Sequence, residues 1–227
     1  MNQTLLNGLS KLGISLEAAK INQLETYMNL IMEFNKTYNI MKAESIDELT
    51  TNHILDSLAA VPYLTEEIKR LKVEFGENLK LADIGSGGGC PGIPLSIVFD
   101  EVSFTLVERM DKRCAFLERC IAKLGLNNTK VLPLQADKVK PQSFHLEVFR
   151  AFHPFENKIM KILLNMLIPG GTLCAYKARA EKINSEMQDV HVFFDGPQKN
   201  GHQLTWERIQ LQVPGLEDHE RNLVVVK

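Results

Sequence analysis

The sequence has little cysteine, and the cysteines that it has are not arranged in pairs. Its 227 residues contain four, at positions 90, 114, 120 and 174. They form no C-x-x-C pair, and none has a metal-ligating partner at a suitable spacing. This pattern argues against a disulfide framework and against a zinc site, and it favours reduced thiols. We therefore expect no metal.

Long apolar runs are also missing. No segment approaches the roughly 20 apolar residues that cross a bilayer, and the amino terminus, MNQTLLNGLSKLG, lacks the basic and apolar blocks of a signal peptide. These absences argue against a membrane protein and indicate a cytoplasmic location. With 44% hydrophobic residues, the chain is long enough for one substantial core.

The net charge of the chain is small, but positive charge is concentrated in its middle. The formal net charge is −2, which argues against a protein that coats nucleic acid nonspecifically. Residues 109–182, however, contain 14 Lys and Arg against 6 Asp and Glu, a balance of +8 that leaves −10 elsewhere. The basic middle is either a set of solvated helix faces or the binding surface of a phosphate-rich substrate.

The first 76 residues are predicted to be helical. Apolar residues at a three-to-four spacing predict one helix over residues 16–38, with Ser15 as its N-cap. Ser45-Ile46-Asp47-Glu48 is a capping box that starts a second helix, reaching about residue 63, and a short charged helix follows over residues 65–74. We expect residues 1–76 to form a helical extension that packs on a core of residues 77–227, giving effectively one domain.

After residue 76, short apolar runs alternate with helical segments. Strands are predicted at residues 79–84, 104–107, 131–134, 146–149 and 172–176, and helices after Pro91, at 111–124 with Gly125 as C-terminal cap, and at 155–167 before a Pro169-Gly170-Gly171 turn. This alternation predicts an α/β fold with a parallel sheet covered on both faces. Residues 190–194, 204–213 and 222–226 are predicted as further strands, the last two as an antiparallel pair at one edge.

The most informative segment is LADIGSGGGCPGIPLS, residues 81–96, where the first predicted strand turns into its helix. In an open parallel sheet this turn binds ligands. The segment fits the dinucleotide fingerprint G-x-G-x-x-G from Gly87. That match begins two residues too late after the strand, and Pro91 and Pro94 remove N–H groups that a pyrophosphate would need. The tail after Tyr176 is also too short and too strand-like for a second catalytic domain.

A second interpretation takes residues 83–89 as D-x-G-x-G-x-G, which resembles the first motif of class I methyltransferases that use S-adenosylmethionine. Asp83 ends the strand and is placed near the amino group of this cofactor, while glycines leave room for its methionine part. Glu108 ends the next strand and can accept both ribose hydroxyls. The residues assigned by this placement are Asp83, Gly85, Gly87, Gly89, Glu108, Ala136 and Asp137, the last two beside the adenine.

Beyond this motif, the sequence resembles one family over nearly its full length. The segments that carry the resemblance include NKTYN at 35–39, HILDSL at 53–58, the whole of 83–98, KR at 112–113, RAF at 150–152, YK at 176–177, and LQVP at 211–214 with LVVVK at 223–227. They resemble the bacterial small-subunit ribosomal RNA methyltransferase G family, also called glucose-inhibited division protein B. The resemblance departs at Ile40-Met41 and at Ala178.

The resemblance implies a class I, Rossmann-like fold with a mostly parallel seven-stranded sheet. It implies N7 methylation of one guanine in the decoding-region loop of 16S rRNA, with S-adenosylmethionine as cofactor. The partner would be 16S rRNA or the small ribosomal subunit, not DNA, and we expect a monomer. Carried over by position, the cofactor contacts are Gly85, Cys90, Ala136, Asp137 and Arg150.

Guanine N7 has a free lone pair and no proton to lose, so methylation there requires orientation rather than a base. The sequence agrees, because the place of the Asx-Pro-Pro-aromatic motif of exocyclic-amine methyltransferases is held by Phe149-Arg150-Ala151-Phe152. Cys90 is interpreted as a small lining residue rather than a nucleophile. Arg150 is the catalytic candidate, since a cation there could bind the cofactor carboxylate or guanine O6, and its alternative role is a structural ion pair.

Six residues are candidates for RNA contact: Lys112, Arg113, Lys177, Arg179, His53 and Phe152. The four cations are possible phosphate contacts, His53 is a possible rim residue, and Phe152 could stack on a flipped base. The helical extension is interpreted as a lid or an RNA-docking surface. Two other hypotheses stay open, a small-molecule methyltransferase of the same fold and a cofactor-binding protein without catalysis.

Overall fold

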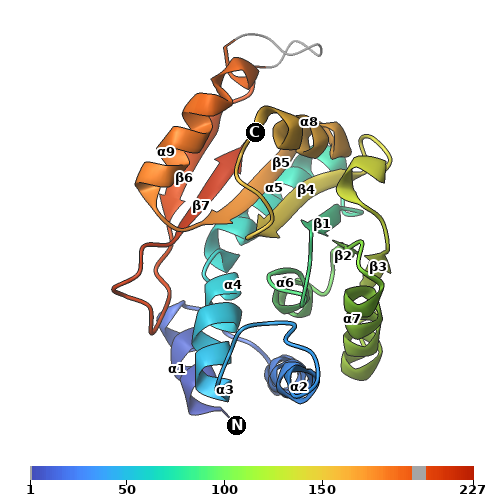
Figure 1. Ribbon diagram of the computed structural model, residues 1–227, viewed down its shortest axis with the longest axis vertical. Coiled ribbons are helices and arrows are strands. Elements are labelled where there is room, and N and C mark those ends of the chain that lie inside the picture. The colour runs from blue at the N-terminus through green and yellow to red at the C-terminus, as the bar shows by residue number, and fades with distance from the viewer. Residues whose placement is uncertain (1, 196–202) are drawn as a thin grey trace.

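A single mixed sheet forms the centre of the molecule (Figure 1). The computed structural model describes residues 2–195 and 203–227. Seven strands hydrogen-bond in the order β3-β2-β1-β4-β5-β7-β6. Their bounds are β1 Lys80–Ile84, β2 Ser103–Val107, β3 Thr129–Leu132, β4 Phe144–Arg150, β5 Leu167–Lys177, β6 Trp206–Gln210 and β7 Asn222–Val226.

The sheet is parallel from β3 to β5 and then reverses direction. β7 pairs antiparallel with β5, with Tyr176 opposite Leu223, and β6 pairs antiparallel with β7. The strand order and the antiparallel edge confirm the predicted seven-stranded α/β fold. Because β1 to β5 are parallel, their carboxyl ends share one edge of the sheet, where a ligand site is expected.

Helices cover both faces of the sheet. The helical segments are α1 Gln3–Lys11, α2 Ala18–Asn35, α3 Ile46–Leu49, η1 Thr50–Leu55, α4 Asp56–Leu58, α5 Val61–Phe75, α6 Gly92–Val98, α7 Asp111–Leu124, η2 Ala136–Lys138, α8 Asn157–Met166, α9 Ala180–Asp189 and η3 His191–Phe193. One buried apolar cluster joins one face of the sheet to α2, α5, α6 and α7, and a second joins the other face to α8 and α9. Of the helices described, none is long and apolar enough to cross a membrane.

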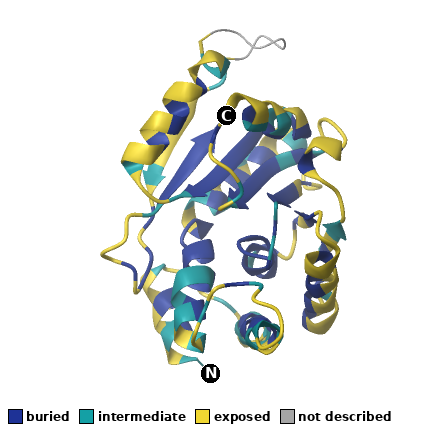
Figure 2. Ribbon diagram, in the orientation of Figure 1, coloured by how far each residue is buried: buried dark blue, intermediate teal, exposed yellow. Residues whose placement is uncertain are grey.

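The burial pattern explains why these segments form strands and surface helices. In Figure 2 the central strands are buried, whereas α7, α8 and α9 are exposed along their outer sides. In β1, Leu81 belongs to the first cluster and Ala82 and Ile84 to the second, because successive side chains point to opposite faces. Both faces therefore need apolar residues, which gives the short continuous apolar runs seen in the sequence.

The helical extension differs from its prediction in two details. α2 begins after Glu17 without a side-chain cap, so the expected N-cap at Ser15 is wrong. Ser45 does cap α3 by accepting a hydrogen bond from the Glu48 N–H, which confirms that start. The second predicted helix is divided into α3, the π-helical η1 and α4, and α5 then starts at Val61 with Pro62 in its first turn.

The carboxyl-terminal third shows the larger errors. α9 was not predicted, and the strand expected at residues 190–194 is wrong, because His191–Phe193 is a turn of 3₁₀ helix. The predicted Pro-Gly-Gly turn lies inside β5, which starts at Leu167, with Gly170 at a φ of 82°. Earlier in the chain, β3 starts and ends two residues before its predicted range.

Candidate functional site

The glycine loop follows β1 at the carboxyl edge of the sheet. The Gly85 and Ser86 N–H groups both donate to the Val107 carbonyl, at 2.9 and 3.1 Å, so β2 fixes the start of the loop. Gly87 has a φ of 57°, and the nearest atoms to a Cβ added there would be 3.8 and 3.9 Å away. A side chain at Gly87 would therefore clash with no neighbouring atom, but it would require a left-handed backbone conformation that favours glycine.

Asp83 lies at the base of this loop with one oxygen engaged and one unengaged. Its Oδ2 accepts from the Gly92 N–H at 3.0 Å. Its Oδ1 is buried and has no hydrogen-bond partner among the residues described. Burial raises the pKa of this carboxyl to about 7, against the lowering effect of the Gly92 hydrogen bond. A buried acceptor without a partner is rare, and it marks a place where a donor fits.

Glu108, directly after β2, binds the backbone of the glycine loop. Its Oε2 accepts from the Gly87 N–H at 2.9 Å, and its Oε1 accepts from the N–H groups of Arg109 and Met110 at 2.8 and 2.9 Å. The Arg113 guanidinium lies 3.7 Å from the same carboxylate. Glu108 therefore stands beside the loop, as the sequence predicts, and also holds its backbone.

Tyr27 of α2 supports the loop from inside the core, a role that the sequence did not reveal. Its hydroxyl donates to the Gly88 carbonyl at 2.6 Å and lies 3.4 Å from Cys90 Sγ. Burial raises the pKa of the Cys90 thiol, so Cys90 is a thiol rather than a thiolate at neutral pH. All four cysteines are free and buried. These observations argue against Cys90 as a nucleophile, while its role as a small lining residue stays a prediction.

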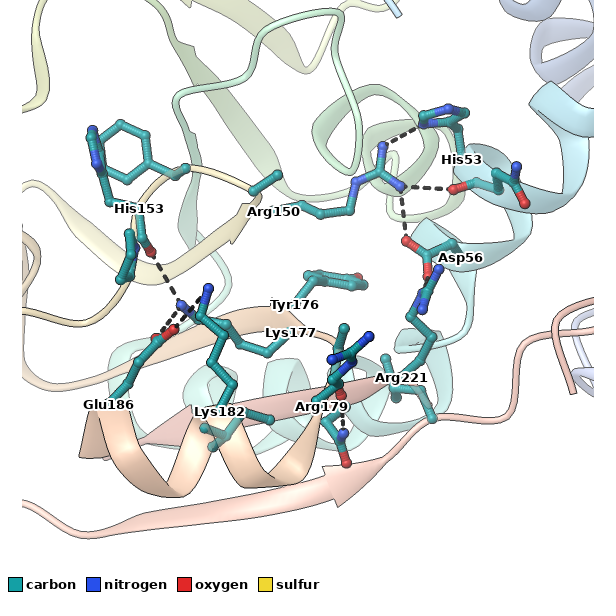
Figure 3. Close-up of a pocket in the computed structure, with 18 residues that line it drawn as sticks. His53, Asp56, Arg150, His153, Tyr176, Lys177, Arg179, Lys182, Glu186 and Arg221 are labelled. Carbon is teal, nitrogen blue, oxygen red and sulfur yellow. Dashed lines mark hydrogen bonds and ion pairs between the residues drawn. The ribbon is translucent and has the colours of Figure 1, made fainter. Parts of the chain in front are cut away.

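A cavity of about 770 Å³ opens where β4 and β5 end (Figure 3). It is bounded by these strand ends, by η1 and α4, by α9 and by the start of β7. Five cationic side chains and two carboxylates line it: Arg150, Lys177, Arg179, Lys182 and Arg221, with Asp56 and Glu186. The excess of cations suits an anionic ligand.

Arg150, the last residue of β4, points across the cavity toward η1 (Figure 3). Its guanidinium donates to Asp56 Oδ2 at 2.8 Å, to the Asn52 carbonyl at 3.1 Å and to His53 Nδ1 at 2.9 Å. Because arginine only donates, His53 Nδ1 must accept, and Nε2–H then donates to the Lys42 carbonyl at 2.9 Å. Burial and the neighbouring Arg150 lower the pKa of His53, which favours this neutral form.

Asp56 connects Arg150 to a second arginine. Arg221, just before β7, donates to Asp56 Oδ1 at 3.0 Å, so one carboxylate binds two guanidinium groups. The sequence placed Asp56 one turn from His53 but gave no sign of Arg221, which is 165 residues away. The alternative role of Arg150 as a member of a structural ion pair is thus present in the structure, beside its exposure to the cavity.

Lys177 and Arg179 lie on the opposite wall of the cavity. The Lys177 ammonium donates to Glu186 Oε2 at 2.6 Å and to the His153 carbonyl at 3.1 Å, and it lies 4.4 Å from the centre of the Phe155 ring. It is therefore engaged by protein groups. Arg179 is exposed at the start of α9, which leaves it the more accessible of the two cations.

Phe152 connects the cavity with the glycine loop. A Cβ added to Gly85 would lie 2.3 Å from the Phe152 ring, so the ring rests on the loop backbone. Between Arg150 and Phe152, Ala151 has a φ of 52°. This left-handed conformation is uncommon for a residue with a side chain. It turns the chain after β4, with the Arg150 side chain on η1 and the Phe152 ring on the loop.

The structure brings together some of the predicted residues and separates others. Of the predicted residues, those that line the cavity are His53, Arg150, Phe152, Lys177 and Arg179. The lining includes none of the predicted cofactor contacts in the glycine loop, and it does not include Glu108, Ala136 or Asp137. Asp137 lies in η2, 3.8 Å from the Lys138 ammonium. Lys112 and Arg113 are on α7, where Lys112 lies 5.1 Å from the centre of the Tyr38 ring.

The fold and the loop define the class of protein. A solved structure of a putative O-methyltransferase from Klebsiella pneumoniae aligns with 97% of this chain and 94% of its own, at a TM-score of 0.58 and 12% identity. At this identity the likeness shows the fold, which is that of class I methyltransferases. The sequence motif at residues 83–89 lies at the end of β1 and in the loop that follows it.

Sequence relatives define the family. A family model described as rRNA small subunit methyltransferase G matches residues 20–209. A protein named ribosomal RNA small subunit methyltransferase G from Treponema denticola is 35% identical, over 100% of this chain and 94% of the relative. One of the same name from Escherichia fergusonii is 34% identical, over 98% of each. The chain belongs to the rRNA small subunit methyltransferase G family.

Proposed function

We propose that this protein transfers a methyl group from S-adenosylmethionine to N7 of one guanine in the decoding-region loop of 16S rRNA. The observation that carries the proposal is the position of the cationic cavity. It opens at the carboxyl edge of the sheet, and Phe152 joins it to the glycine loop. An anionic substrate in the cavity would therefore meet a cofactor held at the loop. The reaction would take place in the cytoplasm, with a monomeric enzyme.

The residues of the loop fit this cofactor. Asp83 Oδ1 is a buried acceptor without a partner among the described residues, and the ammonium of the cofactor would supply the missing donor. At Gly87 the nearest atoms to an added Cβ are 3.8 Å away or more, so the absence of a side chain would let a ligand approach the backbone. Glu108 stands beside Gly87 for the ribose hydroxyls, and Ala136 and Asp137 follow β3, where the adenine is expected.

S-adenosylmethionine supplies a methyl group on a positively charged sulfur, which makes the methyl carbon electrophilic. The N7 lone pair would form the new N–C bond while the S–C bond breaks, and the electrons of the S–C bond would stay on sulfur. The positive charge of the sulfonium would thereby appear on the methylated guanine. No proton moves, so the protein has to align the two groups rather than exchange protons with them.

The groups around the cavity agree with a reaction that needs no base. Asp56 is bound by two arginines, and Glu186 is bound by Lys177 and by the Phe155 N–H at 2.9 Å. Both carboxylates are therefore engaged by protein donors. The Cys90 thiol is buried in the core with a raised pKa, which disfavours the covalent route that C5 methylation of pyrimidines requires.

Arg150 and Phe152 would orient the guanine. The Arg150 guanidinium is held by Asp56 and His53 in one position at the cavity, where it could bind guanine O6 or the cofactor carboxylate. The half-buried Phe152 ring lies over the loop and offers a stacking surface to a flipped base. Arg179 at the rim is the accessible candidate for a phosphate contact.

A methyl-transfer assay tests the function. Tritium-labelled cofactor is incubated with 16S rRNA or 30S subunits from a strain lacking this activity, and the RNA is digested to nucleosides. We expect label in 7-methylguanosine. Label in another nucleoside would refute the N7 assignment. Cofactor binding without label in any RNA would refute the RNA substrate and favour a small-molecule methyltransferase.

A further inference from the structure

A second basic surface begins at the amino ends of the parallel strands, opposite the carboxyl edge, and extends along β3 to η2. A hollow of about 560 Å³ is lined by the first residues of β1, β2, β3 and β4, with the segment that leads from β3 to β4. Its lining contains four lysines, Lys80, Lys130, Lys138 and Lys140, and no aspartate or glutamate. We call it the lysine hollow.

The hollow exists because one crossover of the sheet lacks a full helix. The connections from β1 to β2, from β2 to β3 and from β4 to β5 contain α6, α7 and α8, whereas the connection from β3 to β4 contains only the three-residue η2. This part of the sheet face is therefore incompletely covered, and Leu134 remains 39% exposed beside the lysines. Ser143 and Asn127 add hydrogen-bonding groups to the rim.

The lysines of the hollow are largely without counter-charges. Lys138 lies 3.8 Å from Asp137. In the part of the chain that the structure describes, Lys80, Lys130 and Lys140 have no carboxylate within ion-pair distance, and all three are exposed. Lys123, Lys158 and Lys161 on α7 and α8 also have no ion pair among the described residues, so the hollow is distinguished by the gathering of four lysines in one place. Cations gathered without anions produce a positive potential that attracts a polyanion.

We propose that the lysine hollow binds the phosphate backbone of the RNA substrate at a second place, remote from the methylated guanine. The proposal rests on the RNA substrate proposed above. β4 joins the two places, with Phe144 at the hollow and Arg150 at the active-site cavity. Six residue steps of about 3.3 Å separate them by roughly 20 Å, so a single nucleotide cannot occupy both but a folded RNA can.

The chemistry of the hollow indicates the form that this contact takes. Lysine ammonium groups bind phosphates as point charges and carry little base specificity. The hollow would therefore position the RNA without selecting the guanine, and it would act on substrate affinity rather than on the chemical step. Its contribution should decrease steeply as salt is added, because each phosphate contact releases counterions.

The test replaces Lys80, Lys130 and Lys140 together by glutamine and leaves Lys138 in place, because it adjoins the predicted cofactor contact Asp137. The matched control replaces Lys123, Lys158 and Lys161, which are exposed lysines of α7 and α8, by glutamine. Both triple variants lose the same charge. Cofactor binding by calorimetry and thermal unfolding report whether each variant is folded.

KM and kcat are measured for 16S rRNA and for 30S subunits at several salt concentrations. For the hollow variant we expect KM for both substrates to rise roughly 10- to 100-fold at about 0.15 M salt, and the salt slope to fall by about 2 to 3. The loss should fall on KM rather than on kcat. The control variant should change KM much less.

Three outcomes would overturn the proposal. Equal changes in both triple variants would mean that only total charge matters. An unchanged KM in the hollow variant would mean that RNA does not contact the hollow. A change with 30S subunits but not with 16S rRNA would mean that the hollow binds a ribosomal protein. If the unsubstituted enzyme methylated no RNA at all, the proposed function itself would be wrong.

Discussion

Replacing Asp83 by asparagine should stabilise the unliganded protein and weaken its cofactor. Burial raises the pKa of this carboxyl from 3.8 to about 7. A folded-state pKa above the unfolded value contributes stability that is complete below pH 4 and is lost as pH rises to 7. Three pKa units at 1.36 kcal/mol each make this loss about 4 kcal/mol. Asparagine has no charge to bury, so the loss should disappear.

The assay compares urea unfolding of wild type and Asp83→Asn at pH 5.5 and pH 8.5. Between pH 5.5 and 7, the titration of Asp83 lowers the free energy of unfolding of wild type by about 2 kcal/mol. The free energy of unfolding of the variant relative to wild type should therefore be higher at pH 8.5 than at pH 5.5 by about that amount. Glu147, also buried with a raised pKa, is present in both proteins and cancels. Asp189→Asn, an exposed change of equal charge, should show no such difference.

Cofactor affinity provides the second half of this prediction. A charge-assisted hydrogen bond is worth about 1.5–3 kcal/mol, so the variant should bind S-adenosylmethionine roughly 10- to 150-fold more weakly at pH 8.5. Wild-type affinity should rise with pH as Asp83 loses its proton. Unchanged affinity in the variant would exclude Asp83 as the ammonium partner, and an unchanged pH dependence of stability would refute the buried-charge argument.

Three further substitutions test the supports of the site. Tyr27→Phe removes the hydrogen bond to the Gly88 carbonyl and should weaken cofactor binding by roughly 2- to 10-fold in calorimetry; an unchanged affinity would mean that the loop does not need it. Cys90→Ser should retain turnover within a few-fold in the tritium assay, and a loss beyond about 100-fold would reinstate a cysteine mechanism. Arg150→Ala should abolish methyl transfer while circular dichroism remains that of the folded protein, and normal turnover would remove Arg150 from the site.

The sequence predicted those parts of the fold whose signals are local. The apolar runs of β1 to β5 and β7, the capping box at Ser45 and the glycine at 125 each specify an element within a few residues, and the structure confirms these elements, whereas the run at residues 190–194 is 3₁₀ helix rather than strand. α9 was missed because its buried residues, Ile183, Glu186 and Met187, include a charge. The helical spacing was present, but Glu186 is buried only because Lys177 pairs with it, and that pairing depends on the tertiary fold.

The residues of the site likewise include some that a local sequence signal predicts and some that depend on the tertiary fold. Asp83 and Glu108 follow from strand ends, which a sequence displays, and the structure places both at the glycine loop. Arg150 was a candidate for the same reason. Its partners could not be predicted, because Asp56 and Arg221 come from an irregular helical turn and from the approach to β7. Their approach to Arg150 depends on the packing of elements far apart in the chain.

The helical extension contributes directly to the site, and the lid or RNA-docking role suggested by the sequence stays a prediction beside this contribution. Tyr27 of α2 lies beneath the glycine loop, and Asp56 and His53 hold Arg150. The Ser57 carbonyl accepts from the Tyr176 hydroxyl at the end of β5. These contacts are buried or half-buried, and each reaches a different strand end or loop at the carboxyl edge. A lid would leave the site intact when it opens, whereas separating this extension from the sheet would release both the loop and Arg150. The extension is therefore part of the frame that holds the glycine loop and Arg150 in place. In the proposals above, this frame would orient cofactor and guanine, and the cations of the cavity and of the lysine hollow would contact the RNA.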